Sequence, residues 1–400
     1  MPTIAYISAQ FPLRSETFVY REVRELRRRG WDVICVTLNP PTDLPESADD
    51  LIDNRITVYR HKWFLDNDAN VEYASNVKRG LATQWRVWAD AVFPGERTSV
   101  STRAKLGVQW RGGLLLASEL RPRGVSHIHC HFAHAPTSVG MYAAMQLDIP
   151  FSFTGHANDL FQRRALLKRK LQRAKFVSCI SEEHRKLYNS IHARPDVEYP
   201  IIRCGVDVNS FDAVSKNNTH APRVITVCRL VEKKGVDTLI RAFNALNHPT
   251  AELLIAGDGP QRAELERIAG ENVTGRITFL GAVSNERVRG LIQESDIFAL
   301  PCRVDRNGDK DGIPVVLMEA MACSVPVIAG DLPAIRELVI DNQTGKVVDA
   351  TRVEPTTEAL RVLLQDKTLA RSIGAAGRTR VIDEFSLSKN VDRLEHAMGR

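Results

Sequence analysis

The stretch DGIPVVLMEAMA (311–322) combines two carboxylates with the start of a helix. Pro314 suits a first helical turn, because the N–H that proline lacks would be unpaired there anyway. Asp311 then lies in the loop before this helix and Glu319 in its second turn. The N–H groups of the helix start could bind a diphosphate, and the carboxylates could accept hydrogen bonds from sugar hydroxyls. A well-capped buried helix with Glu319 paired to an arginine would have the same local sequence.

Histidines form a second group. His127, His129 and His131 alternate along one face of an expected strand, so a zinc site is conceivable, although core or cleft-lining histidines are the favoured interpretation. His156 differs, because it lies in a loop at the carboxyl end of a strand, where α/β proteins bind ligands. We therefore favour a functional role for His156 over that of a satisfied loop histidine.

Two metal motifs are almost present beside this helix. Asp309 and Asp311 form a D-x-D triplet, which arises easily by chance. A calcium loop starting at Asn307 would need its closing glutamate at position twelve, which is Met318, so Glu319 misses by one residue. We predict no metal site.

The elements that position these residues alternate between strands and helices. The run 3–8 predicts a strand, 15–30 a helix with Ser15 as its N-cap, and 31–38 the next strand, which together make a βαβ unit. Such alternation with apolar strands predicts doubly wound parallel sheets of the α/β class. Further strands are expected at 126–132, 150–155, 175–180, 224–230, 251–257, 276–281, 296–301 and 325–330.

The pattern restarts after a polar stretch at 208–223 that is typical of a linker. We therefore expect two Rossmann-like domains, 1–207 and 208–384, that face a central cleft and bind ligands beyond the carboxyl ends of their strands. The amphipathic helix at 385–400 is expected to pack back onto the first domain. A length of 400 residues agrees with two domains.

Composition excludes several classes of protein. Hydrophobic residues at 44% and charged residues at 26% argue against disordered, collagen-like and disulfide-stapled chains. The seven cysteines are scattered without a C-x-x-C motif, which favours a reduced cytosol over a disulfide framework or zinc knuckle. We expect no signal peptide at the N-terminus and no membrane span, since no apolar run approaches roughly 18 residues.

Charge is distributed unevenly. Residues 1–200 contain 28 Lys and Arg against 21 Asp and Glu, a net of +7, whereas 201–400 contain 26 against 27, a net of −1. Seven cations lie in 163–176, where a solvated helix face and a membrane or polyanion-binding face both explain them. The tryptophans are core residues or interfacial anchors. All five fall in the first half: Trp31, Trp63, Trp85, Trp88 and Trp110.

Several motifs together resemble one enzyme family. D-G-I-P-x4-E-A-M-A-C-x-x-P-V-I-A, from residue 311, resembles the E-x7-E signature of the GT4-type retaining glycosyltransferases of GT-B fold. CRLVEKKG (228–235) resembles the family's G-R-L-x4-K-G. In the first half, SETF, HIHCHFAH and SFTGHANDLF look like the colanic-acid-type branch that builds cell-surface polysaccharides.

The resemblance implies roles for individual residues. Arg229 and Lys234 match positions that bind the donor diphosphate, together with the helix start at Gly312, Ile313, Pro314 and Val315. Glu319 matches the glutamate that binds the nucleotide ribose. Asp311 matches the glutamate that holds the donor sugar, but it is one methylene shorter. His156 matches the histidine beside the reacting centre, and Ser15, Glu16, His131 and Asp159 are expected on the acceptor side.

The implied activity is retaining transfer of a hexosyl unit from a UDP- or GDP-type sugar to a hydroxyl acceptor. The expected partners are a lipid-linked saccharide and an anionic membrane surface on the cytoplasmic side, with no nucleic acid. We expect a front-face mechanism without metal or other cofactor. Two alternatives stay open: a GT-B-fold sugar-nucleotide epimerase, and a non-catalytic polyanion-binding protein that uses only the basic half.

Overall fold

The computed structural model describes residues 2–45, 48–59, 85, 89–90, 99–156, 158–161, 164–193, 199–211, 221–270 and 276–399. The chain divides into two compact units. Unit 1 comprises Met1–Arg203 with Val391–Arg400, and unit 2 comprises Cys204–Asn390. Trp63, Trp88 and most of the expected linker, residues 212–220, lie outside the described residues.

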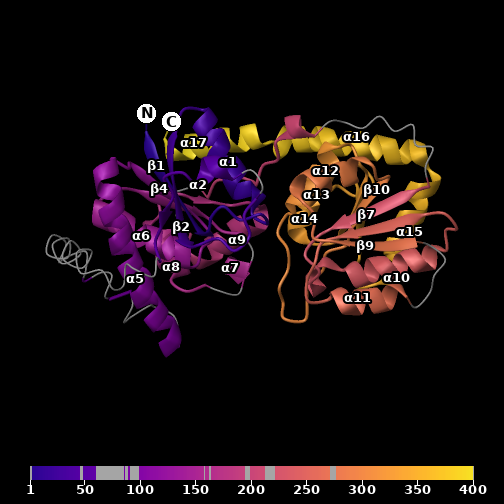
Figure 1. The fold of residues 1–400 in the computed structure, drawn as a ribbon, viewed down its shortest axis with the longest axis horizontal. Coiled ribbons are helices and arrows are strands. Elements are labelled where there is room, and N and C mark those ends of the chain that lie inside the picture. The colour runs from indigo at the N-terminus through magenta and orange to yellow at the C-terminus, as the bar shows by residue number, and fades with distance from the viewer. Residues whose placement is uncertain are drawn as a thin grey trace. The chain divides into compact units, whose positions relative to one another are not determined.

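Unit 1 is built on a six-stranded sheet of order β3-β2-β1-β4-β5-β6. Figure 1 labels β1, β2 and β4 of this sheet. All of its strand pairs are parallel. Strand order reverses between β1 and β4, and this reversal is the switch point where doubly wound sheets bind ligands. The strands are β1 (Thr3–Gln10), β2 (Asp32–Asn39), β3 (Ile56–Thr57), β4 (His127–His131), β5 (Phe151–Thr154) and β6 (Val177–Ser178).

Helices cover both faces of this sheet. Gly140 of α6 lies so close to the side chains of Ile7 and Cys130 that a Cβ at 140 would be 3.2 and 2.3 Å from them. Glu22 of α1 contacts Tyr6 on the opposite face, because side chains alternate along a strand. The described helices are α1 (Thr17–Arg28), α2 (Asp49–Ile52), α5 (Val100–Leu120), η1 (Arg121–Arg123), α6 (Ala135–Leu147), α7 (Asn158–Phe161), α8 (Leu167–Arg173) and α9 (Glu182–Ile191).

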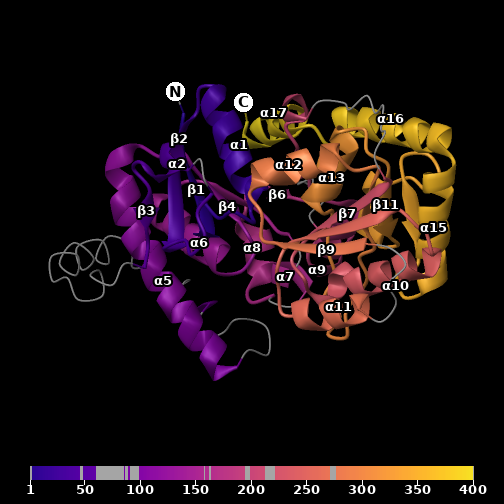
Figure 2. The same ribbon diagram turned by 45° about the vertical axis from the view of Figure 1, so that its right-hand side comes forward.

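The C-terminal helix α17 (Leu387–Met398) returns to unit 1 and lies beside α1 in both views (Figures 1 and 2). Glu395 accepts hydrogen bonds of 2.6 Å from Arg29 and from the indole of the buried Trp31. The ammonium of Lys175 donates to the Met398 carbonyl at 2.7 Å. The end of the chain is thus tied to the segments that precede β2 and β6.

Unit 2 repeats the architecture, with a parallel sheet of order β12-β11-β10-β7-β8-β9 and its switch point between β7 and β10. Its strands are β7 (Arg223–Val227), β8 (Glu252–Ala256), β9 (Arg276–Gly281), β10 (Ile297–Leu300), β11 (Val327–Gly330) and β12 (Lys346–Val348). Its helices are η2 (Val208–Ser210), η3 (Glu232–Lys234), α10 (Val236–Leu246), α11 (Arg262–Ala269), α12 (Asn285–Gln293), α13 (Val315–Ala322), α14 (Pro333–Leu338), α15 (Val353–Gln365) and α16 (Lys367–Glu384).

The prediction of two Rossmann-like sheets is confirmed, and every predicted strand overlaps an observed one. The prediction of Ser15 as an N-cap is wrong. Glu16 occupies that position and α1 begins at Thr17, while the Glu16 carboxylate accepts a hydrogen bond from Ser8 at the end of β1. No helix in the described part of the chain is long and apolar enough to cross a membrane.

Candidate functional site

The segments that follow β7 and β10 come together at the switch point of unit 2. Val224 and Ile225 of β7 are in register with Ile297 and Phe298 of β10, so the carboxyl ends of both strands meet at one edge. The backbone N–H of Arg303 donates to the Lys233 carbonyl at 2.8 Å. This contact joins the loop after β10 to η3.

Close backbone packing fixes this edge. A Cβ at Gly235, whose φ is +64°, would lie 2.0 Å from the Pro301 carbonyl oxygen, and a Cβ at Gly330 would lie 1.7 Å from that of Cys302. Only glycine permits such approaches. The loops that carry the candidate residues are therefore held by backbone contacts.

Asp311 lies between two lysines. Its carboxylate is 2.7 Å from Lys234 Nζ and 3.3 Å from Lys233 Nζ, and the Cys302 thiol donates to it at 3.2 Å. Burial raises the pKa of Asp311, but the two ammonium groups lower it more, so the net shift is downward. Asp311 also raises the pKa of Lys234 against the opposing effect of burial. Both groups therefore remain charged at neutral pH.

The two lysines also affect whether the D-x-D triplet, Asp309 and Asp311, could hold a metal ion. Asp309 is 3.0 Å from Lys233 Nζ, so both aspartates of the triplet already have cationic partners. The positive charge that a divalent ion would supply comes from ammonium groups here. This arrangement favours the prediction that the triplet holds no metal.

The helix after Asp311 is α13, which starts at Val315 with Pro314 at the N-cap rather than in the first turn. Ile313, Pro314 and Glu319 are buried. Arg229 is exposed directly after β7. The predicted donor-side residues thus all occupy segments that follow the two switch-point strands.

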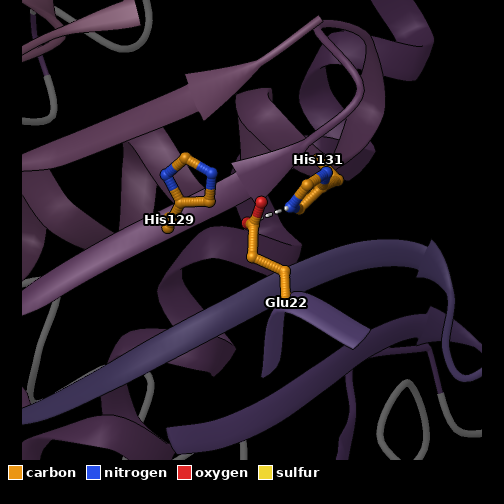
Figure 3. Close-up of side chains that lie close together, drawn as sticks. All are labelled: Glu22, His129 and His131. Carbon is orange, nitrogen blue, oxygen red and sulfur yellow. Dashed lines mark hydrogen bonds and ion pairs between the residues drawn. The ribbon is translucent and has the colours of Figure 1, made fainter. Parts of the chain in front are cut away.

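The switch point of unit 1 carries a different set of side chains (Figure 3). Glu22 reaches from α1 toward His129 and His131 of β4. His131 Nε2 is 3.2 Å from Glu22 Oε1, and the Tyr6 hydroxyl donates to the same oxygen. All four side chains are buried.

His156 extends this group beyond β5. Its Nε2 lies 3.1 Å from His131 Nδ1. The rings of Phe18 and Phe132 pack against it, with centroids 4.5 and 4.7 Å away. Burial lowers the pKa of His156, and likewise that of His131, to about 3. Both imidazoles are therefore neutral at physiological pH.

Asp159 holds the loops around His156. Its carboxylate accepts hydrogen bonds from the backbone N–H of Ala133 at 2.7 Å and of His156 at 3.1 Å. Burial raises the pKa of Glu16 to about 7, an effect that the charge of Asp159 increases and the Ser8 hydrogen bond opposes. Ser15 is exposed. Of the acceptor-side candidates, His131 and Asp159 thus contact His156, Glu16 interacts electrostatically with Asp159, and Ser15 faces solvent.

The alternating histidines of β4 have hydrogen-bond partners on β5. Ser152 Oγ is 2.7 Å from both His127 Nε2 and His129 Nδ1, and Thr154 Oγ1 is 3.1 Å from His129 Nε2. Ligand atoms of Glu22, His129 and His131 also lie within 4.8 Å of one another, a spacing that could accommodate a metal. Because both nitrogens of His129 already contact hydroxyls, the geometry favours hydrogen-bonded core histidines over zinc.

Two family models match the chain in succession. The model described as Glycosyltransferase Family 4 matches residues 15–210, and that described as Glycosyl transferases group 1 matches residues 207–380. The chain belongs to the family 4 type of glycosyltransferases.

Relatives agree with this assignment. A GDP-mannose-dependent alpha-(1-6)-phosphatidylinositol monomannoside mannosyltransferase of Mycolicibacterium smegmatis is 38% identical over 177 residues, which are 43% of this chain and 46% of that one. The alignment therefore spans about half the length of that relative. The amylovoran biosynthesis glycosyltransferase AmsK of Erwinia amylovora is 26% identical over 96% of both chains.

Solved structures agree with the GT-B fold expected for this glycosyltransferase. HepE of Anabaena in complex with UDP and glucose superimposes with a TM-score of 0.69 at 15% identity, covering 100% of this chain and 99% of that one. At this identity the likeness concerns the fold alone.

In the basic segment 163–176 of this glycosyltransferase, several cations make internal contacts within unit 1. Arg169 and Arg173 form ion pairs with the buried Asp90. Lys170 is fully buried and donates to the carbonyls of Ala133, His134 and Ala165 at 2.6 to 3.0 Å. Trp110 packs against the core, whereas Trp85 is 66% exposed.

Among the residues of the two sites that were not predicted from the sequence are Glu22, Tyr6 and Lys233. A signal for Glu22 exists, because it lies on the same stripe of α1 as the buried Val19, Val23 and Leu26. An acidic residue on an apolar stripe indicates a buried partner.

Proposed function

We propose that this glycosyltransferase transfers a hexosyl unit from a nucleotide-diphosphate sugar to a hydroxyl acceptor, with retention of anomeric configuration. The observation that carries the proposal is the pair of lysines on Asp311, in the segments that precede α13 at the switch point of unit 2. A diphosphate needs permanent cations, and a sugar needs a fixed hydrogen-bond acceptor. This edge offers both kinds of group.

Lys234 and Arg229 would stabilise the diphosphate as the bond to the sugar breaks. An ammonium has three N–H donors, so Lys234 can keep its contact with Asp311 while it binds a phosphate oxygen. The N–H groups from Gly312 to Val315 would add further donors. Preorganised donors at a developing anion supply much of the rate enhancement in many enzymes, and no metal or cofactor is needed for this role.

The transfer step would occur on one face of the sugar. The acceptor oxygen forms its bond to the anomeric carbon on the face from which the diphosphate oxygen leaves. The proton of the acceptor hydroxyl passes to an oxygen of the leaving diphosphate. His156, neutral and fixed by Phe18 and Phe132, would orient a hydroxyl beside the reacting carbon.

A lipid-linked saccharide in cell-surface polysaccharide synthesis is the acceptor class that we propose, at the cytoplasmic side of an anionic membrane. The support is the net charge of +7 in residues 1–200 and the names of the relatives, a phosphatidylinositol monomannoside mannosyltransferase and an amylovoran biosynthesis enzyme. Sedimentation with anionic vesicles tests the membrane part; absence of binding would contradict it.

Calorimetry with UDP and GDP tests the donor site directly. Glu319→Ala should weaken binding of the preferred nucleotide by at least roughly tenfold, because a buried carboxylate that bonds a ribose is lost. The exposed Glu264→Ala serves as the control. Unchanged affinity in Glu319→Ala would overturn the assignment.

Mass spectrometry of the stabilising donor with candidate acceptors tests the reaction. Transfer should persist in EDTA, and NMR of the first product should show the anomeric configuration of the donor. Conversion of the donor without any acceptor would indicate an epimerase instead. Loss of transfer in EDTA with recovery on adding divalent ions would contradict the metal-free mechanism.

A further inference from the structure

Four side chains form one continuous hydrogen-bonded chain inside unit 1. The Tyr6 hydroxyl donates to Glu22, and His131 Nε2 lies 3.2 Å from the same carboxylate oxygen (Figure 3). On its other side, His131 Nδ1 lies 3.1 Å from His156 Nε2. Each of these residues is at most 8% exposed. Buried polar groups depend on one another for hydrogen bonds, so the protonation of one member constrains the next.

The direction of these hydrogen bonds follows from the chemistry of the Glu22 carboxylate. An ionised carboxylate can only accept, so His131 must donate from Nε2 and accept at Nδ1. A neutral imidazole has one N–H and one lone pair, so His156 must then donate from Nε2. The lone pair of His156 is thereby placed on Nδ1.

We propose that Glu22, acting through His131, is a positioning residue that determines which nitrogen of His156 carries the proton. Its consequence for transfer rests on the proposed function, in which His156 orients a sugar hydroxyl. With the lone pair on Nδ1, His156 can accept a hydrogen bond from that hydroxyl. With the opposite tautomer it could only donate from the same atom.

A protonated, neutral Glu22 would reverse the donor and acceptor roles along these hydrogen bonds, because its O–H could donate to His131 Nε2. Burial raises the pKa of Glu22 above its ordinary value, and the neighbouring histidines and the hydrogen bond from Tyr6 oppose this rise. The groups facing this carboxylate are Tyr6 from β1, His129 and His131 from β4, and His156 after β5. The Tyr6 donor therefore favours the carboxylate and the Nδ1 lone pair.

Nitrogen NMR of the full chain, labelled with ¹⁵N-histidine and free of ligands, tests the proposal. In the wild type at pH 7.5, His131 and His156 should both show the Nε2–H tautomer. In Glu22→Leu, His131 loses its acceptor, and the tautomer ratio of His156 should shift toward Nδ1–H by roughly tenfold, as expected for loss of a charged hydrogen bond. Glu25→Leu, the same change on the same helix outside this chain of bonds, should leave the ratio unchanged.

Three results would overturn the proposal. One is a wild-type His156 that carries its proton on Nδ1, and another is an unchanged tautomer ratio in Glu22→Leu. The third is one equivalent of zinc in the purified protein that is lost in Glu22→Leu, which would make Glu22, His129 and His131 a metal centre.

Tyr6→Phe provides an independent test if Glu22→Leu does not fold. It removes one donor from the Glu22 carboxylate, so the pKa of Glu22 should rise and both histidine tautomers should reverse at a higher pH than in the wild type. A reversal pH equal to that of the wild type would contradict control by Glu22.

Kinetics separate this proposal from the proposed function. With an active donor and acceptor, Glu22→Leu should lower kcat by roughly 10²-fold, the lower range for acid–base groups, and leave the donor KM unchanged. Unchanged kcat would refute the positioning role while transfer stands. If the tautomers respond in NMR but no donor is transferred by the wild type, the proposed function fails and the control of the tautomers stands.

Discussion

The two switch points of this molecule have the same strand order but opposite electrostatics. In unit 2, Lys233, Lys234 and Asp311 are charged and joined by ion pairs. In unit 1, His131 and His156 are buried and neutral, with the pKa of each near 3. One topology therefore supports an edge built around permanent cations and an edge built around neutral imidazoles.

The difference matches two kinds of ligand. A diphosphate carries its charge at every physiological pH, so permanent cations suit it. A sugar hydroxyl is neutral and can either donate or accept a hydrogen bond. A neutral histidine with a defined tautomer therefore suits it. In the proposed function, the side chains at each switch point, rather than the shared sheet topology, determine which ligand each unit takes.

The charged edge should show the largest effect on activity. Lys234→Met should lower kcat/KM for the donor by roughly 10²- to 10³-fold, the loss typical of removing one preorganised donor from a developing anion. Steady-state kinetics with the preferred nucleotide sugar measure it. Lys367→Met, an exposed lysine at the start of α16, is the control. A loss below roughly threefold would show that Lys234 binds only Asp311.

The backbone packing of the charged edge should be the next most sensitive feature. Gly330→Ala places a Cβ 1.7 Å from the Cys302 carbonyl oxygen, and a backbone atom cannot rotate away. We expect a loss of about 3 kcal/mol in the free energy of unfolding of unit 2, measured by hydrogen exchange. Gly107→Ala, which meets nothing within 4 Å, should cost nothing or stabilise α5. Equal effects would refute backbone contact as the cause.

Much of this architecture follows from the sequence. The long strands are apolar runs flanked by polar loops, and they were predicted within a few residues. β3 and β12 were missed because Ile56–Thr57 and Lys346–Val348 are too short for a period-two pattern. Residues after the strands could be placed at the sheet edges because parallel strands share their carboxyl ends.

The pairing of side chains could not be predicted in the same way. Asp311 and Lys234 were assigned separate roles on sugar and diphosphate, yet they contact each other, since their distance depends on how the loops after β7 and β10 pack. The cations of 163–176 were expected on a solvated helix face or on a membrane or polyanion-binding face, but Lys170 is buried and donates to carbonyls of three residues. A run of cations in the sequence does not show which carbonyl groups from distant segments will accept their hydrogen bonds in the folded protein.

The two units should lose stability at different pH values in acid. The buried histidines of unit 1 have folded-state pKa values below the ordinary value, so the unfolded chain takes up protons first and stability falls below about pH 6.5. Raised carboxyl pKa values of Glu16 and Glu22 oppose this. We expect a net loss of about 2 kcal/mol between pH 7.5 and 5.5. In unit 2 the stabilisation from Asp311, whose pKa is lowered, is lost only below about pH 4.

Tryptophan fluorescence measures this loss selectively, because all five tryptophans lie within Met1–Arg203. Hydrogen exchange of β7 and β10 peptides provides the control in unit 2. Parallel acid destabilisation of both units, or none in unit 1, would contradict the contrast between charged and neutral edges.

Glu16→Gln should have the smallest effect and a sign that depends on pH. The folded-state pKa of Glu16 is about 7, above that of an unfolded glutamate near 4.3. Its protonation therefore stabilises the fold as the pH falls from about 7 toward 4.3, and ionisation costs stability above pH 7. Glu16→Gln should raise the stability of unit 1 by about 1 kcal/mol at pH 7.5, after discounting for partial solvent contact, and should steepen its loss in acid. A variant with the wild-type pH dependence would show that Glu16 keeps an ordinary pKa and that the histidines alone set the acid sensitivity of this edge.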